Sequence, residues 1–282
     1  MIVAIASGKG GTGKTTVAVN LALVVRRPVR LLDCDVEEPN VHLFLDAGPA
    51  VNEPVGILVP VVDPTLCDGC GECSRFCRYH AIVVLKERPL VFPEMCHGCG
   101  GCLQVCPQKA IHEVVRRIGV VRTSQAGRIS LVQGSLDVGV ALAPPLIREV
   151  QQRIQPGTDT VIDAPPGTSC PMIVTVRRAD VIVLVTEPTP FGLHDLTLAV
   201  ETVRELGRSF VVVVNREGVG DDRVHRYCRQ EGIPIVLEIP DDRRIAETYS
   251  RGERVVDRLP EYRSLFRQLA ERLGLGIGPE KE

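Results

Sequence analysis

A glycine-rich segment near the start of the chain, SGKGGTGKTT from residue 7, constrains the fold more than any other feature. It matches the pattern G-x-x-x-x-G-K-S/T and lies between a short β-branched run, IVAIA, and an apolar segment of helical length, TTVAVNLALVV. In such a loop the glycines let backbone N–H groups turn inward around phosphate, the lysine neutralises β- and γ-phosphate oxygens, and the hydroxyl faces Mg²⁺. The segment therefore predicts a strand–loop–helix unit that binds phosphate. Its candidate binding residues are Gly8, Gly10, Gly11, Thr12, Gly13, Lys14, Thr15 and Thr16.

The choice of basic residues supports this interpretation. Five of the 33 Lys and Arg residues are lysines, and two of the five, Lys9 and Lys14, belong to this loop. Elsewhere the sequence mostly uses arginine where a basic side chain faces solvent. The retention of lysine here indicates that the loop has a specific function.

Beyond residue 114 the chain alternates between apolar, β-branched runs and segments of helical length. The predicted strands lie in 160–167, 179–190, 209–218 and 233–242, and the predicted helices near 193–206, 222–231 and 260–273. Apolar strands that alternate with helices imply a parallel sheet covered on both faces, whose polar strand ends meet at one ligand-binding edge. We therefore expect an α/β fold built on a doubly wound parallel sheet, with a hairpin added over 122–139.

Eight of the 11 cysteines form two similar runs, CDGCGECSRFC from residue 67 and, 29 residues later, CHGCGGCLQVC. The Ala-Ile pair that follows each run is repeated at the same offset. This internal repeat predicts a pseudo-twofold domain over residues 62–113, inserted between two parts of the α/β domain, 1–61 and 114–282.

The cysteine spacing predicts iron–sulfur chemistry. Three thiolates in C-x₂-C-x₂-C ligate one cubane, and the fourth cysteine of each run ligates the other, an arrangement that resembles a bacterial two-cluster ferredoxin. One [4Fe–4S] cluster would use Cys67, Cys70, Cys73 and Cys106, and the other Cys96, Cys99, Cys102 and Cys77. Zinc is the alternative, but its sites usually pair two C-x₂-C knuckles.

The two runs differ in one respect. The second ends in Cys106-Pro107, whereas the first ends in Cys77-Arg78, so we expect a shifted reduction potential there rather than a lost cluster. His80 and His97 lie among the cysteines, but eight thiolates are already present, so we expect both histidines to face solvent.

Composition excludes several classes of protein. The formal net charge of −2 shows no excess of positive charge of the kind that attracts nucleic acid. No stretch approaches the ~20 apolar residues that cross a bilayer, and the first residues read as a strand rather than a signal peptide. Because most cysteines lie in ligand-like runs, a secreted disulfide scaffold is disfavoured and a reducing, cytoplasmic location is expected.

The form KGGTGKT, with its early Lys9, resembles the deviant phosphate loop of the MinD, Mrp and nitrogenase-reductase group. In that group the first lysine reaches across a homodimer to the partner's nucleotide, so the resemblance implies a nucleotide-dependent homodimer that hydrolyses ATP with Mg²⁺. The segment Asp33-Cys34-Asp35 resembles the first switch of the group. The resemblance implies that Asp35 orients the attacking water and that Asp33 supports the metal, with Lys14 on the phosphates.

Two further segments resemble this group. The segment DAPPG from residue 163 resembles its second switch, which places Asp163 near Mg²⁺ through water and the Gly167 N–H toward the γ-phosphate. Asn215, at the end of VVVVN, resembles the asparagine that reads adenine. A single aspartate is more often a helix cap or turn residue, but four matches in order favour the functional interpretation.

The whole arrangement resembles MinD-superfamily P-loop ATPases with an inserted ferredoxin domain. The first functional expectation is an ATPase whose dimer switch controls electron delivery to a partner metalloprotein. The alternatives are an Mrp-like factor that transfers a cluster or metal to an apo-protein, and a MinD-like spatial organiser. The marker of the last would be a membrane-binding C-terminal helix. A face of Tyr262, Leu265, Phe266, Leu269 and Leu273 is present, but docking on the core is preferred.

Cys170 lies seven residues after Asp163, as does a cluster-binding cysteine of the nitrogenase-reductase branch in that resemblance. We expect a small buried cysteine that packs against its helix. A transient metal contact at a dimer seam is the alternative.

Overall fold

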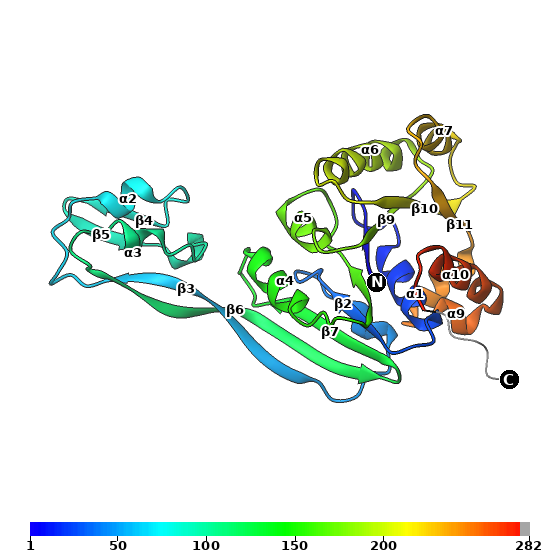
Figure 1. Ribbon diagram of the computed structural model, residues 1–282, viewed down its shortest axis with the longest axis horizontal. Helices are drawn as coiled ribbons and strands as arrows, with labels where there is room; N and C mark the ends of the chain where they lie inside the picture. The colour runs from blue at the N-terminus through cyan, green and yellow to red at the C-terminus, as the bar shows by residue number, and fades with distance from the viewer. Residues whose placement is uncertain (277–282) are drawn as a thin grey trace.

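The computed structural model describes residues 1–276, and its central element is a nine-stranded sheet in the order β11-β10-β9-β1-β8-β2-β7-β6-β3 (Figure 1). The first seven of these strands are parallel to their neighbours, whereas β6 is antiparallel to β7 and to β3. The strands are β1 (Ile2–Ala6), β2 (Val29–Asp33), β3 (Val51–Val62), β6 (Ile111–Ala126), β7 (Ile129–Leu136), β8 (Asp159–Asp163), β9 (Val181–Thr186), β10 (Phe210–Glu217) and β11 (Ile235–Pro240). The predicted parallel sheet and the added hairpin, β6–β7, are therefore confirmed.

The inner parallel strands bury both faces, and side chains on opposite faces of a strand enter different cores because they alternate. In β1, Val3 and Ile5 belong to one hydrophobic core, and Ala4 and Ala6 to a second core on the opposite face. One core is covered by α1 (Lys14–Val24), α8 (Arg243–Ser250), α9 (Val255–Arg258) and α10 (Pro260–Arg272). The other is covered by α4 (Ala143–Gln151), α5 (Cys170–Val176), α6 (Pro190–Glu205) and α7 (Arg223–Gln230). The sheet is thus doubly wound, as predicted.

The last helix, α10, packs on the body of the protein. Tyr262, Phe266 and Leu269 are buried in the core beside α1, and Leu265 packs against its edge. The apolar face that would have marked a membrane-binding helix is therefore covered. In the part of the chain that the structure describes, no helix is long and apolar enough to span a bilayer.

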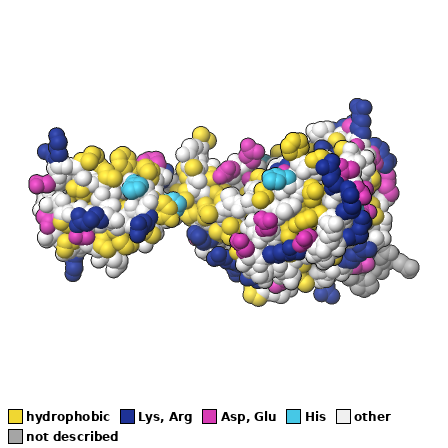
Figure 2. Space-filling model, turned by 90° about the horizontal axis from the view of Figure 1, so that it is seen from above, with side chains coloured by type: hydrophobic (Ala, Val, Ile, Leu, Met, Phe, Trp, Pro, Cys, Tyr) yellow, Lys and Arg dark blue, Asp and Glu magenta, His cyan; other side chains and the backbone are white. Residues whose placement is uncertain are grey.

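The strands β3 and β6 continue beyond the sheet as a two-stranded ribbon, and the cysteine-rich segment sits at its far end (Figure 1). We call residues 63–110 the cysteine module. It contains α2 (Glu72–Phe76), β4 (Ile82–Leu85), β5 (Arg88–Val91), a 3₁₀ turn η2 (Pro93–Met95) and α3 (Gly101–Gln104), and β4 pairs with β5. Figure 2 shows the module as a separate lobe joined to the body by a narrow waist.

The two halves of the module have matching local conformations. The positive φ angles of Gly69 (73°) and Gly71 (81°) recur at Gly98 (66°) and Gly100 (68°), and α2 and α3 begin directly after the second glycine of each pair. Because such φ values favour glycine, the same backbone path follows from the same sequence pattern. The predicted internal repeat is visible in the backbone. The expected boundaries near 62 and 113 fall at the end of β3 and inside β6, so the ribbon strands run through them.

Candidate functional site

The phosphate-binding loop connects β1 to α1 and is closed by close backbone contacts. Asn215 Nδ2 donates a hydrogen bond to the Thr12 carbonyl oxygen at 2.8 Å. Gly13 has a φ of +94°, and a Cβ placed there would lie 2.4 Å from Asn215 Nδ2. A Cβ at Gly8 would lie 2.1 Å from the Asp195 carbonyl oxygen. Glycine at these positions lets the loop pack against β10 and α6 while its N–H groups remain free to turn inward.

Lys14 is the first residue of α1 and is almost fully buried. Burial lowers its pKa, while the neighbouring carboxylates of Asp163 and Asp35 oppose that shift. The structure therefore brings together Lys14, Asp35 and Asp163, which were predicted to act on the phosphates, the attacking water and the metal.

The residues expected at the metal are partly in place. Thr15 Oγ1 donates a hydrogen bond to Asp163 Oδ2 at 2.6 Å, whereas Asp163 Oδ1 is buried without a partner among the described residues. Burial raises the pKa of Asp163 to about 7. A hydroxyl beside an orphaned carboxylate oxygen is a donor set that suits Mg²⁺, which prefers oxygen ligands. The residues present therefore fit the predicted ion.

Asp33 differs from its expected role. Its carboxylate is buried and accepts backbone N–H groups from Asp35 (3.2 Å), Asn40 (3.0 Å) and Val41 (3.1 Å). These contacts fold the loop that follows β2, so in this structure Asp33 shapes the first switch rather than facing the pocket. Its support of a metal remains a prediction.

Asp35 is half-buried and lines the pocket, as expected of a residue that orients water. Burial raises its pKa to about 6, although Lys14 opposes the shift. The two switch segments are also joined directly, because the Cys34 N–H donates to the Asp163 carbonyl oxygen at 2.9 Å.

These residues border a cavity of ≈ 570 Å³, which we call the nucleotide pocket. It extends from the phosphate-binding loop to the ends of β10 and β11 and the start of α8. Its lining includes Gly10, Gly11, Gly13, Lys14, Thr15, Thr16, Asp35, Asn215, Arg216, Asp241, Asp242 and Tyr249. Asn215 lines this pocket, and its predicted contact with adenine stays a prediction.

One predicted contact is different in this structure. The Gly167 N–H, expected to face the γ-phosphate, donates to the Ser7 carbonyl oxygen at 3.0 Å. That bond ties the second switch to the phosphate-binding loop, and the loop must rearrange before this N–H can meet a phosphate.

The Lys9 side chain forms an ion pair within this chain, outside the nucleotide pocket. Its Nζ lies 3.5 Å from Glu187 Oε2, and Glu187 Oε1 is 3.2 Å from an Arg216 guanidinium nitrogen. Sequence reasoning missed Glu187, although a carboxylate directly after the apolar run VIVLVT was a signal. The lysine that was predicted to act on a second subunit is thus held by a buried acid here.

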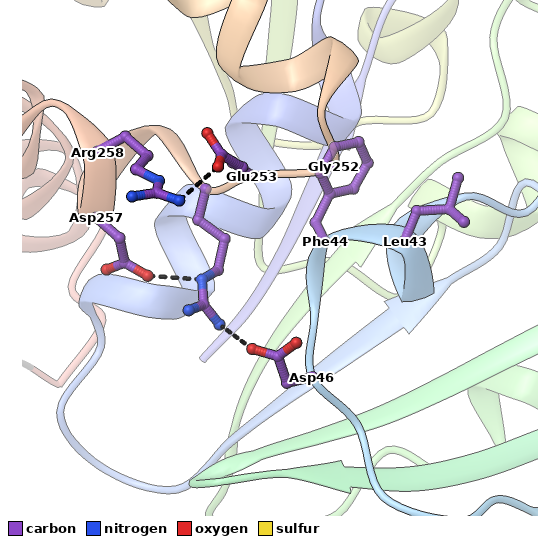
Figure 3. A pocket seen from close by; sticks show the side chains of 8 residues that line it. Leu43, Phe44, Asp46, Gly252, Glu253, Asp257 and Arg258 are labelled. Atoms are coloured by element: carbon purple, nitrogen blue, oxygen red, sulfur yellow. Dashed lines mark hydrogen bonds and ion pairs between the residues drawn. The ribbon is translucent and has the colours of Figure 1, made fainter.

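A second cavity of ≈ 390 Å³ lies between the 3₁₀ turn η1 (Val41–Phe44) and the segment that joins α8 to α9 (Figure 3). Arg254 bridges Asp46 (3.3 Å) and Asp257 (2.6 Å) across it, and Arg258 pairs with Glu253. The Phe44 ring packs 4.7 Å from the Tyr249 ring, which borders the nucleotide pocket. The cavity's charged groups are paired with one another, so we regard it as part of the support for the nucleotide pocket.

The cysteine module contains a cavity of ≈ 330 Å³ that is bordered by Cys77, Cys96, Cys99 and Cys102. These four come from both runs and are the set predicted for the second cluster. The rest of the wall includes Phe76, Tyr79, Ala81, Ile82 and His97.

Of the other predicted set, Cys73 lies near Cys67 and Cys106, and the place of Cys70 in that set stays a prediction. Burial raises the pKa of Cys73, and the nearby thiols of Cys67 and Cys106 add to the shift, which places Cys106 beside the first run. The Ala110 N–H donates to Cys106 Sγ at 3.3 Å, and the Gly98 N–H to Cys96 Sγ at 3.4 Å. Such N–H···S contacts are typical of thiolates that hold iron–sulfur clusters.

The donor set fits two cubanes. Cys77 of the first run borders a cavity with three cysteines of the second run, and Cys106 of the second run lies near Cys73 of the first. The cavity is much larger than a single ion. Among residues 1–276, no three or more His, Cys, Asp or Glu side chains converge as a site for one metal ion.

The histidines and Cys170 have distinct environments. His97 and His80 are exposed, as predicted, but His97 also borders the cavity and stacks on Tyr79 with ring centroids 3.6 Å apart. Cys170, expected to be buried, is instead exposed at the start of α5. Cys170 is the first residue of α5, and the buried residues of this helix, Met172, Thr175 and Val176, lie further along it.

Comparisons with known proteins agree with this architecture. The family described as the CobQ/CobB/MinD/ParA nucleotide binding domain matches residues 3–255. An uncharacterized protein of Methanocaldococcus jannaschii is 31% identical over 245 residues, which cover 85% of this chain and 86% of that protein. An iron-sulfur cluster carrier protein of Aquifex aeolicus is 24% identical, over 92% of this chain but 63% of its own length.

A solved structure shares the fold. The septum site-determining protein MinD of Pyrococcus horikoshii, complexed with Mg-ADP, aligns with a TM-score of 0.61 at 23% identity over 96% of this chain and 95% of that one. At that identity the likeness shows the fold alone. The extent of the family match, together with the M. jannaschii relative, shows that the chain belongs to the CobQ/CobB/MinD/ParA family of nucleotide-binding domains.

Proposed function

We propose that this protein hydrolyses ATP and uses the resulting switch between dimer states to control electron delivery from two [4Fe–4S] clusters to a partner metalloprotein. The observation that carries the proposal is the combination found in one chain. A pocket lined by Lys14 and by Thr15, whose hydroxyl is bonded to Asp163, and a cavity bordered by four cysteines are joined by a continuous two-stranded ribbon.

The nucleotide part of the proposal rests on the charges and positions of the side chains around the nucleotide pocket. Phosphoryl transfer needs little covalent help, so the arrangement of charges supplies most of the rate enhancement. Lys14 and the loop N–H groups would bind the phosphates, Thr15 and Asp163 would hold Mg²⁺, and Asp35 would orient the attacking water. Mg²⁺, when bound, neutralises charge on the phosphate oxygens. Asn215 would contact the adenine.

The dimer part of the proposal rests on Lys9. In this structure Lys9 is paired with Glu187 and does not border its own pocket. We propose that, in a homodimer, Lys9 leaves Glu187 and reaches the nucleotide of the second subunit. Hydrolysis would then depend on the dimer, which makes the nucleotide cycle a switch.

The electron-transfer part rests on the cysteine module, which we propose is the main part of a two-cluster ferredoxin-like domain over residues 62–113. Each cluster, when bound, accepts and releases one electron at a time. The cavity wall of Phe76, Ala81 and Ile82 would keep water from the cluster held by Cys77 and the later run.

A second candidate function is delivery of a cluster to an apo-protein. It is favoured by three relatives that are each named iron-sulfur cluster carrier protein, from Aquifex aeolicus, Pyrococcus horikoshii and Pyrococcus abyssi. Four thiolates around each cluster leave no open position for a receiving protein. For this reason we place electron delivery first.

One experiment separates the two candidates. Cluster-loaded protein is reduced anaerobically, freed of excess reductant and mixed with Mg-ATP and either oxidised cytochrome c or apo-aconitase. Electron delivery predicts that ATP accelerates cytochrome c reduction while about eight irons per chain are retained, as two cubanes require.

The alternative results are distinct. ATP-dependent aconitase activity with loss of iron from the chain would establish the carrier function and contradict electron delivery. Acceleration that persists in Lys14→Ala would contradict control by the nucleotide pocket.

A further inference from the structure

The ribbon leaves the main sheet at a defined junction. The pairing of β6 with β7 covers Gly119–Ala126, whereas the pairing of β3 with β6 continues to Val62 and Ile111 (Figure 1). The β3–β6 register shifts between Val55 and Gly56, so Ile118 is an extra residue on β6. Its side chain is fully buried in the core of the body. Such a bulge bends the strand and fixes the direction in which the ribbon departs.

Two adjacent arginines at this junction point in opposite directions, because successive side chains of a strand alternate. An Arg116 guanidinium nitrogen donates to the Pro93 carbonyl oxygen in the cysteine module at 2.6 Å. Arg117 makes two hydrogen bonds to the Asp137 carboxylate, at 2.9 and 3.0 Å. One arginine therefore binds the module and the other binds the body.

Asp137 is also connected to the nucleotide pocket through the backbone. Asp35 borders that pocket, and the carbonyl oxygen of the next residue, Val36, accepts the Leu136 N–H at 2.9 Å. The Asp137 N–H then donates to the Ile118 carbonyl oxygen at 2.9 Å. A movement of the first switch thus has a continuous hydrogen-bonded route to the base of the ribbon.

The packing along this route leaves little free space. A Cβ at Gly134 would lie 2.5 Å from Val36 Cγ1, and one at Gly119 would lie 2.4 Å from the Ser135 carbonyl oxygen. Tightly packed elements transmit a displacement rather than absorb it.

We propose that Arg117 and Asp137 are positioning residues that couple the first switch to the orientation of the cysteine module. When a nucleotide moves the segment after Asp35, the end of β7 moves with it. The bidentate contact between Asp137 and Arg117 then turns the ribbon and the clusters at its end. The inference rests on the proposed function and names the contact through which the nucleotide acts on the clusters.

Hydrogen exchange measured by mass spectrometry tests the coupling on the full, cluster-loaded chain, with Mg²⁺ and AMP-PNP as the probe. Exchange is followed in peptides of the phosphate-binding loop and in peptides of the ribbon base, residues 115–121. The variants are Asp137→Asn and the exchanged pair Arg117→Asp with Asp137→Arg. The matched control is Glu53→Gln, because Glu53 forms a similarly exposed ion pair with Arg153 (2.7 Å) at the same end of the ribbon.

In the wild type we expect AMP-PNP to slow exchange in the loop and to change exchange at the ribbon base by about threefold, a size suited to a bidentate ion pair near the surface. Asp137→Asn should keep the loop response and lose the ribbon response. The exchanged pair should recover the ribbon response, and Glu53→Gln should keep both.

Two results would overturn the coupling: a wild-type ribbon that does not respond although the loop does, or an Asp137→Asn ribbon that responds fully. A wild-type loop without any response would instead contradict the proposed nucleotide function, so the two failures are distinguishable.

Discussion

Alanine substitutions at three glycines of the phosphate-binding loop separate backbone strain from side-chain contact. Gly10 has no positive φ and open space at the Cβ position, Gly11 has a φ of +79° and open space, and Gly13 has a φ of +94° and Asn215 at 2.4 Å. An L-residue in the left-handed region costs about 1–2 kcal/mol. Displacement of Asn215 would also remove its hydrogen bond to Thr12, which contributes about 1 kcal/mol.

The expected losses in the free energy of unfolding therefore form a series. Gly10→Ala should be neutral or stabilising by up to ~1 kcal/mol, because alanine restricts the unfolded chain. Gly11→Ala should lose ~1–2 kcal/mol, and Gly13→Ala ~2–3 kcal/mol. The measurement is urea-induced unfolding of the nucleotide-free protein under anaerobic conditions, followed by the helical circular dichroism signal.

A double-mutant cycle supplies the control. In an Asn215→Ala background, Gly13→Ala should lose only the backbone contribution and match Gly11→Ala. If Gly13→Ala and Gly11→Ala lose the same free energy with Asn215 intact, the contact between Asn215 and the loop does not stabilise the site and the reasoning is refuted.

Three further predictions concern the dimer, the metal and the clusters. Lys9→Ala should bind nucleotide but hydrolyse it slowly, and mixed dimers of one Lys9→Ala chain and one Asp35→Ala chain should recover activity at one site; no recovery would argue against action in trans. Because burial raises the pKa of Asp163 to about 7, Mg-ATP affinity should rise as pH rises toward 7 and then level off. In the metal-free protein the Asp163 carboxyl contributes its full stabilisation of the folded state below about pH 4, and it loses that contribution as pH rises through 7. Asp163→Asn should remove both pH dependences, and an unchanged pH profile would contradict the assignment. Cys77→Ser should perturb the Mössbauer spectrum of the cluster held by Cys96, Cys99 and Cys102 while Arg78→Ala leaves both clusters intact; damage confined to the other cluster would contradict the exchange of ligands.

Local sequence patterns predicted much of this fold. The apolar runs around 160–167 and 209–218 became β8 and β10 because strands buried on both faces need apolar residues throughout. The repeated cysteines and Ala-Ile pairs predicted the internal repeat, and the glycines between the cysteines adopt the same left-handed conformation in both halves.

Contacts between distant segments were not predictable in the same way. The pairing of Lys9 with Glu187 joins residues that only the sheet order brings together. Asp33 resembled a metal-site residue, but the turn after β2 directs three N–H groups at its carboxylate. The Arg117–Asp137 contact depends on the extra residue in β6, which no pattern in the sequence marks.

The central claim is that the nucleotide pocket and the clusters act as one unit, and an anaerobic redox titration followed by EPR tests it most directly. Cluster potentials depend on solvent exposure and on hydrogen bonds to sulfur, so a module that moves when nucleotide binds should change them. We expect the midpoint potential of at least one cluster to shift when Mg-ATP is added to the wild type and to stay unchanged in Lys14→Ala. Identical potentials and spectra for the wild type with and without Mg-ATP, at saturating nucleotide, would contradict the account.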